Sequence, residues 1–379
     1  MTTLLGSSEL RLDGTVDPPL WCAAFLGAIV QLGTLWYVWA HHSPLGPCLG
    51  SPAACFGGGN TSGTAMAAVI NQDPAWGRLL LLLQPFALLV WLLSLRGHCR
   101  AGAERYADPT LVDRLWSLLP WLFCWYFGAC SGFRNHRVVL MCVLSTLWGV
   151  RLTYNFAIKG GFSGGEDYRW KETRGWFPGW RYELFACVFI HFFQLNLLLA
   201  FSSPVVAAYY SNVPLGWLDA LATALFLSLL GFEAVADEEM YGFQSEKYRR
   251  RAAHQPLGAE YERGFITTGL WSLSRHPNYF AEVSLWWAFY LFSVAALSSV
   301  LNWTLWGTLF LSILFLAPGA SLDVTEALTS RKYDTYPQYQ QAVSRCIPWW
   351  GTPPWHRTRH QTQGSASLHW YELKGDGPR

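Results

Sequence analysis

The chain has 379 residues, of which 52% are hydrophobic and only 14% are charged, against about 25% charged residues in an average soluble domain. This composition excludes an ordinary soluble domain and indicates a membrane protein, and the 22 Trp and 17 Tyr suit the interfaces of a bilayer. The nine cysteines form no Cys-x-x-Cys pair. The common zinc and dithiol spacings are therefore excluded, and we predict no metal site.

The predicted elements are apolar stretches near the length that a bilayer-crossing helix needs, about 20 residues each. Ahead of them, residues 1–19 lack the pattern of a removable signal peptide, so we expect the first span to stay attached. The sequence predicts an all-α fold, a polytopic membrane helix bundle of about eight transmembrane helices. Their ranges are 20–40, 79–95, 115–131, 137–158, 182–203, 215–235, 280–297 and 300–320.

The segments between the spans carry the topology signals. Most of the 27 Lys and Arg fall on the side of the membrane that holds both chain ends, and such charge collects on the cytosolic side. Both termini are therefore predicted to be cytosolic, and the loop 41–76, with Cys48, Cys55 and the sequon at Asn60, to be lumenal. We expect the membrane of the endoplasmic reticulum. The basic run 249–251 is a topology signal and needs no nucleic-acid partner.

Pairs of polar residues recur on the predicted spans, spaced so that both side chains share one helix face. Ionisable residues inside a span are costly and are functional candidates by default. Because the predicted topology puts every pair toward the cytosol, we predict a cofactor cavity open to the cytosol. Interhelical hydrogen bonds, worth about 0.6 to 2 kcal/mol each, are the alternative. The pairs are Arg151 with Asn155, His191 with Gln194, Glu233 with Asp237, Asn278 with Glu282, and Asp323 with Glu326.

The stretch 274–282 is the part of the chain most indicative of a ligand site. Pro277 can occupy the first position of a helix, because its missing N–H would have no partner there. The amides and the positive dipole end of that helix favour an anion, and Arg275 and His276 would add charge. One interpretation is a site for a phosphate-bearing cofactor. The other is an interfacial anchor followed by a membrane span.

Several motifs occur together in an order that is typical of one family. The string 274–282, with Gly269 to Trp271 ahead of it and two tryptophans behind, resembles the signature of the DUF1295 membrane proteins in the steroid 5-alpha-reductase superfamily. Isoprenylcysteine carboxyl methyltransferases carry a similar Arg-His-Pro element, so the ordered set is more specific than the string. The other matching pieces are 112–117 with Pro120, 148–155, 166–170, Glu233 with Asp237, and Glu326 followed by Tyr336, Tyr339 and 347–349.

The resemblance also divides the chain. It covers roughly 108–350, which we interpret as a steroid-reductase-like membrane domain. Residues 1–107 would be an accessory region with two transmembrane helices and the lumenal loop. The polar tail 351–379 is expected to be disordered.

The resemblance implies an enzyme that binds NADPH from the cytosol and reduces a carbon–carbon double bond conjugated to a carbonyl in a lipid or steroid-like substrate. Asp113, seven residues before Pro120, takes the place of the Glu that binds this carbonyl in steroid reductases, and Tyr279 is the second candidate catalytic residue. The Tyr of those enzymes is replaced by Trp148, whose N–H cannot protonate an enolate. Arg275 would be a bidentate phosphate partner. The implied cofactor-binding residues are Arg151, Asn155, Glu233, Asp237, Arg275, His276, Asn278, Tyr279 and Glu282.

Two other functions stay open. A membrane methyltransferase of the isoprenylcysteine type would use the same helix start for S-adenosylmethionine. A non-catalytic scaffold that binds membrane lipids would use none of these residues for chemistry. The charge balance of the predicted site bears on this choice. Its two cations, Arg151 and Arg275, oppose four carboxylates, which are Glu233, Asp237, Glu282 and Glu326. An anionic cofactor would therefore need additional positive charge from the basic run 249–251.

Overall fold

The computed structural model describes residues 75–96, 99–101, 104–162 and 168–350. The chain falls into two compact units: unit 1 comprises the chain up to Phe226 together with Trp286–Leu322, and unit 2 comprises Leu227–Leu285 and the chain from Asp323. The predicted span 20–40, the sequon, Cys48, Cys55 and the tail 351–379 lie outside the described residues.

Long apolar helices dominate the described residues. Six of these helices are long and apolar enough to cross a membrane, and Leu119–Cys130 is a shorter apolar helix. This confirms the prediction of a polytopic membrane helix bundle. The six are Ala75–Arg96, His136–Ile158, Trp180–Tyr209, Trp217–Ala252, Pro277–Leu297 and Leu305–Lys332.

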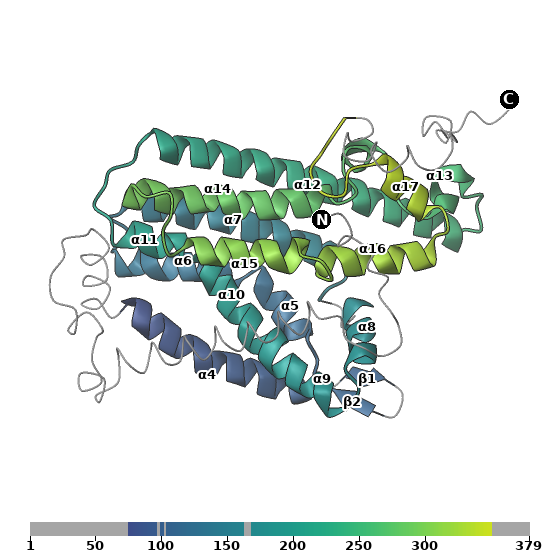
Figure 1. Ribbon diagram of the computed structural model, residues 1–379, viewed down its shortest axis with the longest axis horizontal. Helices are drawn as coiled ribbons and strands as arrows, with labels where there is room; N and C mark the ends of the chain where they lie inside the picture. The colour runs from purple at the N-terminus through teal and green to yellow at the C-terminus, as the bar shows by residue number, and fades with distance from the viewer. Residues whose placement is uncertain (1–74, 97–98, 102–103, 163–167, 351–379) are drawn as a thin grey trace, which may run out of the picture. The chain divides into compact units, whose positions relative to one another are not determined.

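Unit 1 contains most of the helices (Figure 1). Unit 1 also contains a short antiparallel strand pair that the sequence analysis did not predict, in which Arg100 lies opposite Arg105. Its complete elements are α4 (Ala75–Arg96), β1 (Cys99–Ala101), β2 (Glu104–Tyr106), α5 (Thr110–Trp116), α6 (Leu119–Cys130), α7 (His136–Ile158), α8 (Tyr168–Trp176), α9 (Trp180–Phe185), the π-helix η2 (Ala186–Phe193), α10 (Gln194–Ser202), α11 (Pro204–Tyr209) and α15 (Leu305–Leu316).

Close helix contacts form the core of unit 1. Helix α6 packs on α7, and α10 packs on α15. The second contact depends on Gly307, because a Cβ there would lie 2.0 Å from the carbonyl oxygen of Ala200. Small residues commonly let the backbones of membrane helices approach in this way.

A buried ion pair ties α7 to the start of α12 (Trp217–Ala252) within unit 1. Arg137 donates from Nε to Asp219 Oδ1 at 2.7 Å and from Nη2 to Asp219 Oδ2 at 2.8 Å. The same guanidinium donates to the carbonyls of Val213 and Pro214. Such a bidentate pair, with its remaining donors used, fixes the geometry of a buried charge.

Unit 2 contains α13 (Gly258–Arg263), the 3₁₀-helix η3 (Gly269–Ser272) and α17 (Tyr336–Ala342), while α12, α14 (Pro277–Leu297) and α16 (Ser321–Lys332) are divided between the units. Helix α12 continues well past the predicted end at 235. Its last turns carry Glu246, whose carboxylate pairs with Arg249 and Arg250 at 2.7 Å each. Charged pairs at this spacing favour a helix, which a search for apolar stretches could not detect.

The last predicted span, 300–320, is also revised. Helix α15 ends at Leu316, just before Pro318, and α16 begins at Ser321. A proline cannot continue the helix because it lacks the N–H and its ring clashes with the preceding turn. As a result Asp323 and Glu326, expected beyond the last span, lie on a helix of their own.

Candidate functional site

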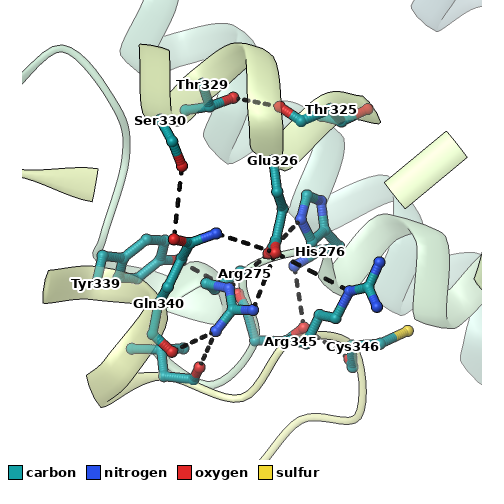
Figure 2. A network of polar contacts seen from close by, with 12 residues as sticks. Arg275, His276, Thr325, Glu326, Thr329, Ser330, Tyr339, Gln340, Arg345 and Cys346 are labelled. Carbon is teal, nitrogen blue, oxygen red and sulfur yellow. Dashed lines mark hydrogen bonds and ion pairs between the residues drawn. The ribbon is translucent and has the colours of Figure 1, made fainter. Parts of the chain in front are cut away.

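In unit 2, Glu326 on α16 lies at the centre of a network of polar contacts (Figure 2). Arg275 donates from Nε to Glu326 Oε1 at 2.6 Å and from Nη2 to Glu326 Oε2 at 3.2 Å. Its Nη1 donates to the carbonyls of Gln340 at 2.6 Å and Val343 at 2.7 Å. These bonds use four of the five N–H donors that a guanidinium possesses.

His276 is held by the same carboxylate. Its Nε2 lies 3.1 Å from Glu326 Oε1, and its backbone N–H donates to Ser274 Oγ at 3.1 Å. Burial lowers the pKa of His276 from its ordinary value, and this outweighs the raising effect of Glu326. The imidazole is therefore neutral at pH 7, and because a carboxylate only accepts, its hydrogen is on Nε2.

The backbone ahead of α14 is paired with the end of the described chain. The N–H of Arg275 donates to the carbonyl of Ser344 at 2.8 Å, and the N–H of Trp349 donates to the carbonyl of Leu273 at 2.9 Å. The buried hydroxyl of Tyr339 donates to the carbonyl of Trp271, and burial raises the pKa of this tyrosine. Residues that follow α16 therefore fix the turn that leads into α14.

These contacts give Arg275 a positioning role. It connects the start of α14 with α16 and with the carbonyls at the end of α17. A phosphate would have to compete with a bidentate carboxylate and two carbonyls for this guanidinium. The predicted role of Arg275 as a phosphate partner stays a prediction.

Helix α14 begins at Pro277, as the sequence predicts. The Oδ1 of Asn278 is a buried acceptor to which no group in the described part of the chain donates a hydrogen bond. The ring of Tyr279 meets the ring of His276 edge to face, with centroids 5.7 Å apart. Glu282, one turn further along α14, is only 9% exposed. The first turns of α14 thus present an amide oxygen and a carboxylate that are largely withdrawn from solvent.

The unit 2 part of α12 lies beside this region. Its Ala236 carbonyl accepts from Trp271 Nε1 at 3.0 Å, and the ring of Phe232 packs edge to face on Phe280 of α14, with centroids 6.2 Å apart. Glu233 and Asp237, the residues next to these contacts in sequence, are 4% and 6% exposed. Within unit 2 the structure therefore brings together the helix segments that carry Glu233, Asp237, Arg275, His276, Asn278, Tyr279 and Glu282.

This set of residues fits one half of NADPH. The carboxamide and the ribose hydroxyls of the cofactor are hydrogen-bond donors, and the buried Asn278 Oδ1 and the carboxylate of Glu282 are acceptors. The phosphates are less well matched. Arg275 is bound by Glu326, and of the basic run 249–251 both Arg249 and Arg250 are paired with Glu246.

The other predicted site residues lie in unit 1. Asp113 on α5 accepts a hydrogen bond from Trp170 Nε1 at 2.9 Å. Arg151 and Asn155 lie on α7, which is linked to α5 by a 2.9 Å hydrogen bond from Thr153 Oγ1 to Ser117 Oγ. The expectation that all the predicted residues line a single cavity stays a prediction.

Trp148, which the resemblance described above aligns with a Tyr of steroid reductases, is a core residue of unit 1. Its side chain is fully buried and meets the ring of Trp286 edge to face, with centroids 4.9 Å apart. The ring fills the core and brings no acid. Trp148 is therefore not a candidate acid.

Sequence reasoning placed Glu326 among the polar pairs of the predicted cavity but not among the cofactor-binding residues, and it did not identify Gln340 or Arg345. Gln340 Nε2 donates to Glu326 Oε2 at 3.1 Å, and Arg345 pairs with Asp323. Their spacing from the stretch 274–282 carries no periodic signal. The signals that pointed to this part of the chain were the pair Asp323 and Glu326 and the ordered motif set in which Tyr336 and Tyr339 follow Glu326.

Comparisons with known proteins match more than half of the chain to one family. A family model described as a protein of unknown function, DUF1295, matches residues 103–345. An uncharacterized protein of Schizosaccharomyces pombe is 35% identical over 277 residues, which cover 70% of this chain and 80% of the relative. No solved structure matches the chain.

Proposed function

We propose, from the premise that the chain belongs to the DUF1295 family, that it is a membrane-embedded, NADPH-dependent reductase of a carbon–carbon double bond in a lipid or steroid-like enone. The observation that carries the proposal is the buried Oδ1 of Asn278, an acceptor without a donor in the described residues, at the start of a membrane helix. Polar groups in this position are functional candidates by default.

The residues of unit 2 would bind and orient the cofactor. Asn278 and Glu282 would accept hydrogen bonds from the carboxamide and the ribose of NADPH, while Arg275 and Glu326 hold the turn ahead of them. When bound, the cofactor supplies a hydride to the β-carbon of the enone. The α-carbon then needs a proton, for which Tyr279 and Asp113 are the candidate acids.

The proposal includes the endoplasmic reticulum membrane with both termini in the cytosol. Support comes from the distribution of Lys and Arg along the sequence. Glycosylation mapping provides a test, because the sequon at Asn60 would then be lumenal. We expect an endoglycosidase to increase the gel mobility of the wild type but not of Asn60→Gln. Modification of a sequon inserted into the tail 351–379 would contradict this topology.

Transfer of deuterium tests the reductase directly. Membranes that contain the protein are incubated with NADPH deuterated at the transferred position, and the lipid fraction is analysed by mass spectrometry. We expect one lipid to gain a single deuterium. Asn278→Ala should weaken NADPH binding about tenfold, the cost of one or two lost hydrogen bonds. Glu262→Gln, a change at an exposed side chain on α13, is the control and should leave the label unchanged.

A methyltransferase is the second candidate, and one observation favours it. Glu233, Asp237 and Glu282 are buried carboxylates in unit 2, whereas Arg275 is already paired with Glu326. Carboxylates suit the sulfonium and amine of S-adenosylmethionine better than they suit the phosphates of NADPH. Thermal unfolding of the purified protein with each ligand separates the two, since only the true cofactor should raise the midpoint at low concentration.

A further inference from the structure

The helical run Trp180–Tyr209 of unit 1 changes its geometry midway. Between α9 and α10 the backbone forms the π-helix η2, Ala186–Phe193. Such segments are rare, and they occur frequently at functional sites. This one carries His191, whose side chain is 0% exposed.

The hydrogen bonds of His191 define which atom is available. Nδ1 lies 2.7 Å from the carbonyl oxygen of Ala186. A carbonyl only accepts, so Nδ1 carries the hydrogen, and in the neutral ring Nε2 is then an acceptor. Among the described residues no group lies within hydrogen-bonding distance of this buried Nε2. Leaving a buried polar atom without a hydrogen-bond partner destabilises the fold.

The neighbouring polar side chains on the same run are matched by other helices of unit 1. Gln194 Oε1 accepts from Trp116 Nε1 of α5 at 2.9 Å. Asn196 Oδ1 accepts from Gln84 Nε2 of α4 at 3.0 Å, and its Nδ2 donates to the carbonyl of Phe192. The fold thus supplies partners to these two polar neighbours on the run, whereas no described group bonds to His191 Nε2.

We propose that Nε2 of His191 binds the hydroxyl group of a lipid alcohol by accepting its hydrogen. In a membrane-spanning helix the ligand that reaches such an atom comes from the bilayer, and a neutral lipid hydroxyl is a donor that can be desolvated at moderate cost. The inference concerns a lipid-binding site in unit 1 alone and goes beyond the proposed function.

Two substitutions test the roles of the two ring nitrogens of His191 separately. His191→Asn keeps an amide near the Nδ1 position, where it can donate to Ala186, but has no group at the Nε2 position. His191→Gln is longer and restores a polar group near Nε2. Because both variants keep a polar side chain of similar bulk, comparison of the two distinguishes loss of ligand from loss of fold.

The assay measures binding without NADPH. Wild type and variants are reconstituted in phosphatidylcholine nanodiscs that contain dioleoylglycerol or cholesterol, or the same lipids with the hydroxyl converted to a methyl ether. Native mass spectrometry then counts the retained lipid. We expect the wild type to retain at least one of the two free alcohols about tenfold more than its ether, as one hydrogen bond to a buried acceptor predicts. His191→Asn should lose this preference and His191→Gln should recover part of it.

Two results would overturn the inference: no preference of the wild type for either alcohol over its ether, or an unchanged preference in His191→Asn. Unchanged binding in His191→Asn would mean that a water or a protein group satisfies Nε2. The assay involves no reduction. Alcohol binding without deuterium transfer would refute the reductase alone, and deuterium transfer without alcohol binding would refute this inference alone.

Discussion

The two units contain buried polar groups of two kinds. In unit 2 the sequence points most clearly to Arg275, and this cation uses four of its five N–H donors to bind Glu326 and two backbone carbonyls. In unit 1 the inconspicuous His191 keeps a buried nitrogen for which the described residues provide no partner. The difference teaches that a charged motif can be a structural clamp. A buried atom whose hydrogen bond is missing is the better indication of a ligand.

The largest effect should come from removing the contacts of Glu326 with Arg275 and His276, which we call the clamp. Glu326→Ala removes the carboxylate that binds Arg275 and His276 and leaves a buried guanidinium without its counter-charge. We expect the free energy of unfolding to fall by about 3–5 kcal/mol. Denaturant titration of the purified protein in mixed micelles measures it. A variant as stable as the wild type would show that Arg275 finds another partner and that the clamp is not structural.

A packing substitution in unit 1 should have the next largest effect. Gly307→Ala puts a methyl group 2.0 Å from the carbonyl oxygen of Ala200, and such overpacking typically costs about 1–3 kcal/mol. Gly231→Ala is the matched control, because no atom lies within 4 Å of a Cβ at that position. The same titration should show destabilisation for the first variant and none for the second. Equal effects would refute the close contact between α10 and α15.

The neutral state of His276 predicts a pH effect of moderate size. Burial holds the pKa of the folded state below the ordinary 6.5, so the unfolded chain binds the proton more readily. Stability is therefore constant with respect to this group above pH 6.5 and falls below it, by at most about 1.4 kcal/mol per pH unit. His276→Gln should reduce this slope between roughly pH 7 and 5. A slope that is the same in the variant would mean that other groups cause it.

The smallest effect should come from a substitution in the partly exposed ion pair beside the Glu326 network. Asp323 pairs with Arg345, but their side chains are 22% and 35% exposed, and ion pairs near solvent contribute about 0–1 kcal/mol. Asp323→Asn should therefore change the free energy of unfolding far less than Glu326→Ala. Equal losses would show that the two carboxylates of α16 act as one unit.

The sequence was sufficient for the parts of the fold that depend on local patterns. Apolar length identified the helices that can cross a membrane, and Pro277 marked the start of α14 because its missing N–H suits that position. It failed where charge pairs extend a helix, as in α12 beyond 235, and where Pro318 divides one apolar stretch into α15 and α16.

The candidate site was predictable only in part. Polar pairs on spans singled out Glu233, Asp237 and Glu282, and the structure shows that all three are buried. The pairing of Arg275 with Glu326 joins residues 51 apart in sequence, which no periodic pattern reveals. The π-helix that holds His191 is likewise a property of the packed backbone and has no signature in the residue types.

The transfer of deuterium from labelled NADPH to a membrane lipid tests the central claim most directly. The account predicts one deuterium per reduced lipid in membranes that contain the wild-type protein, and much less label with Asn278→Ala at limiting NADPH. Label that is absent from the lipid fraction, while the purified protein binds S-adenosylmethionine and not NADPH, would contradict it.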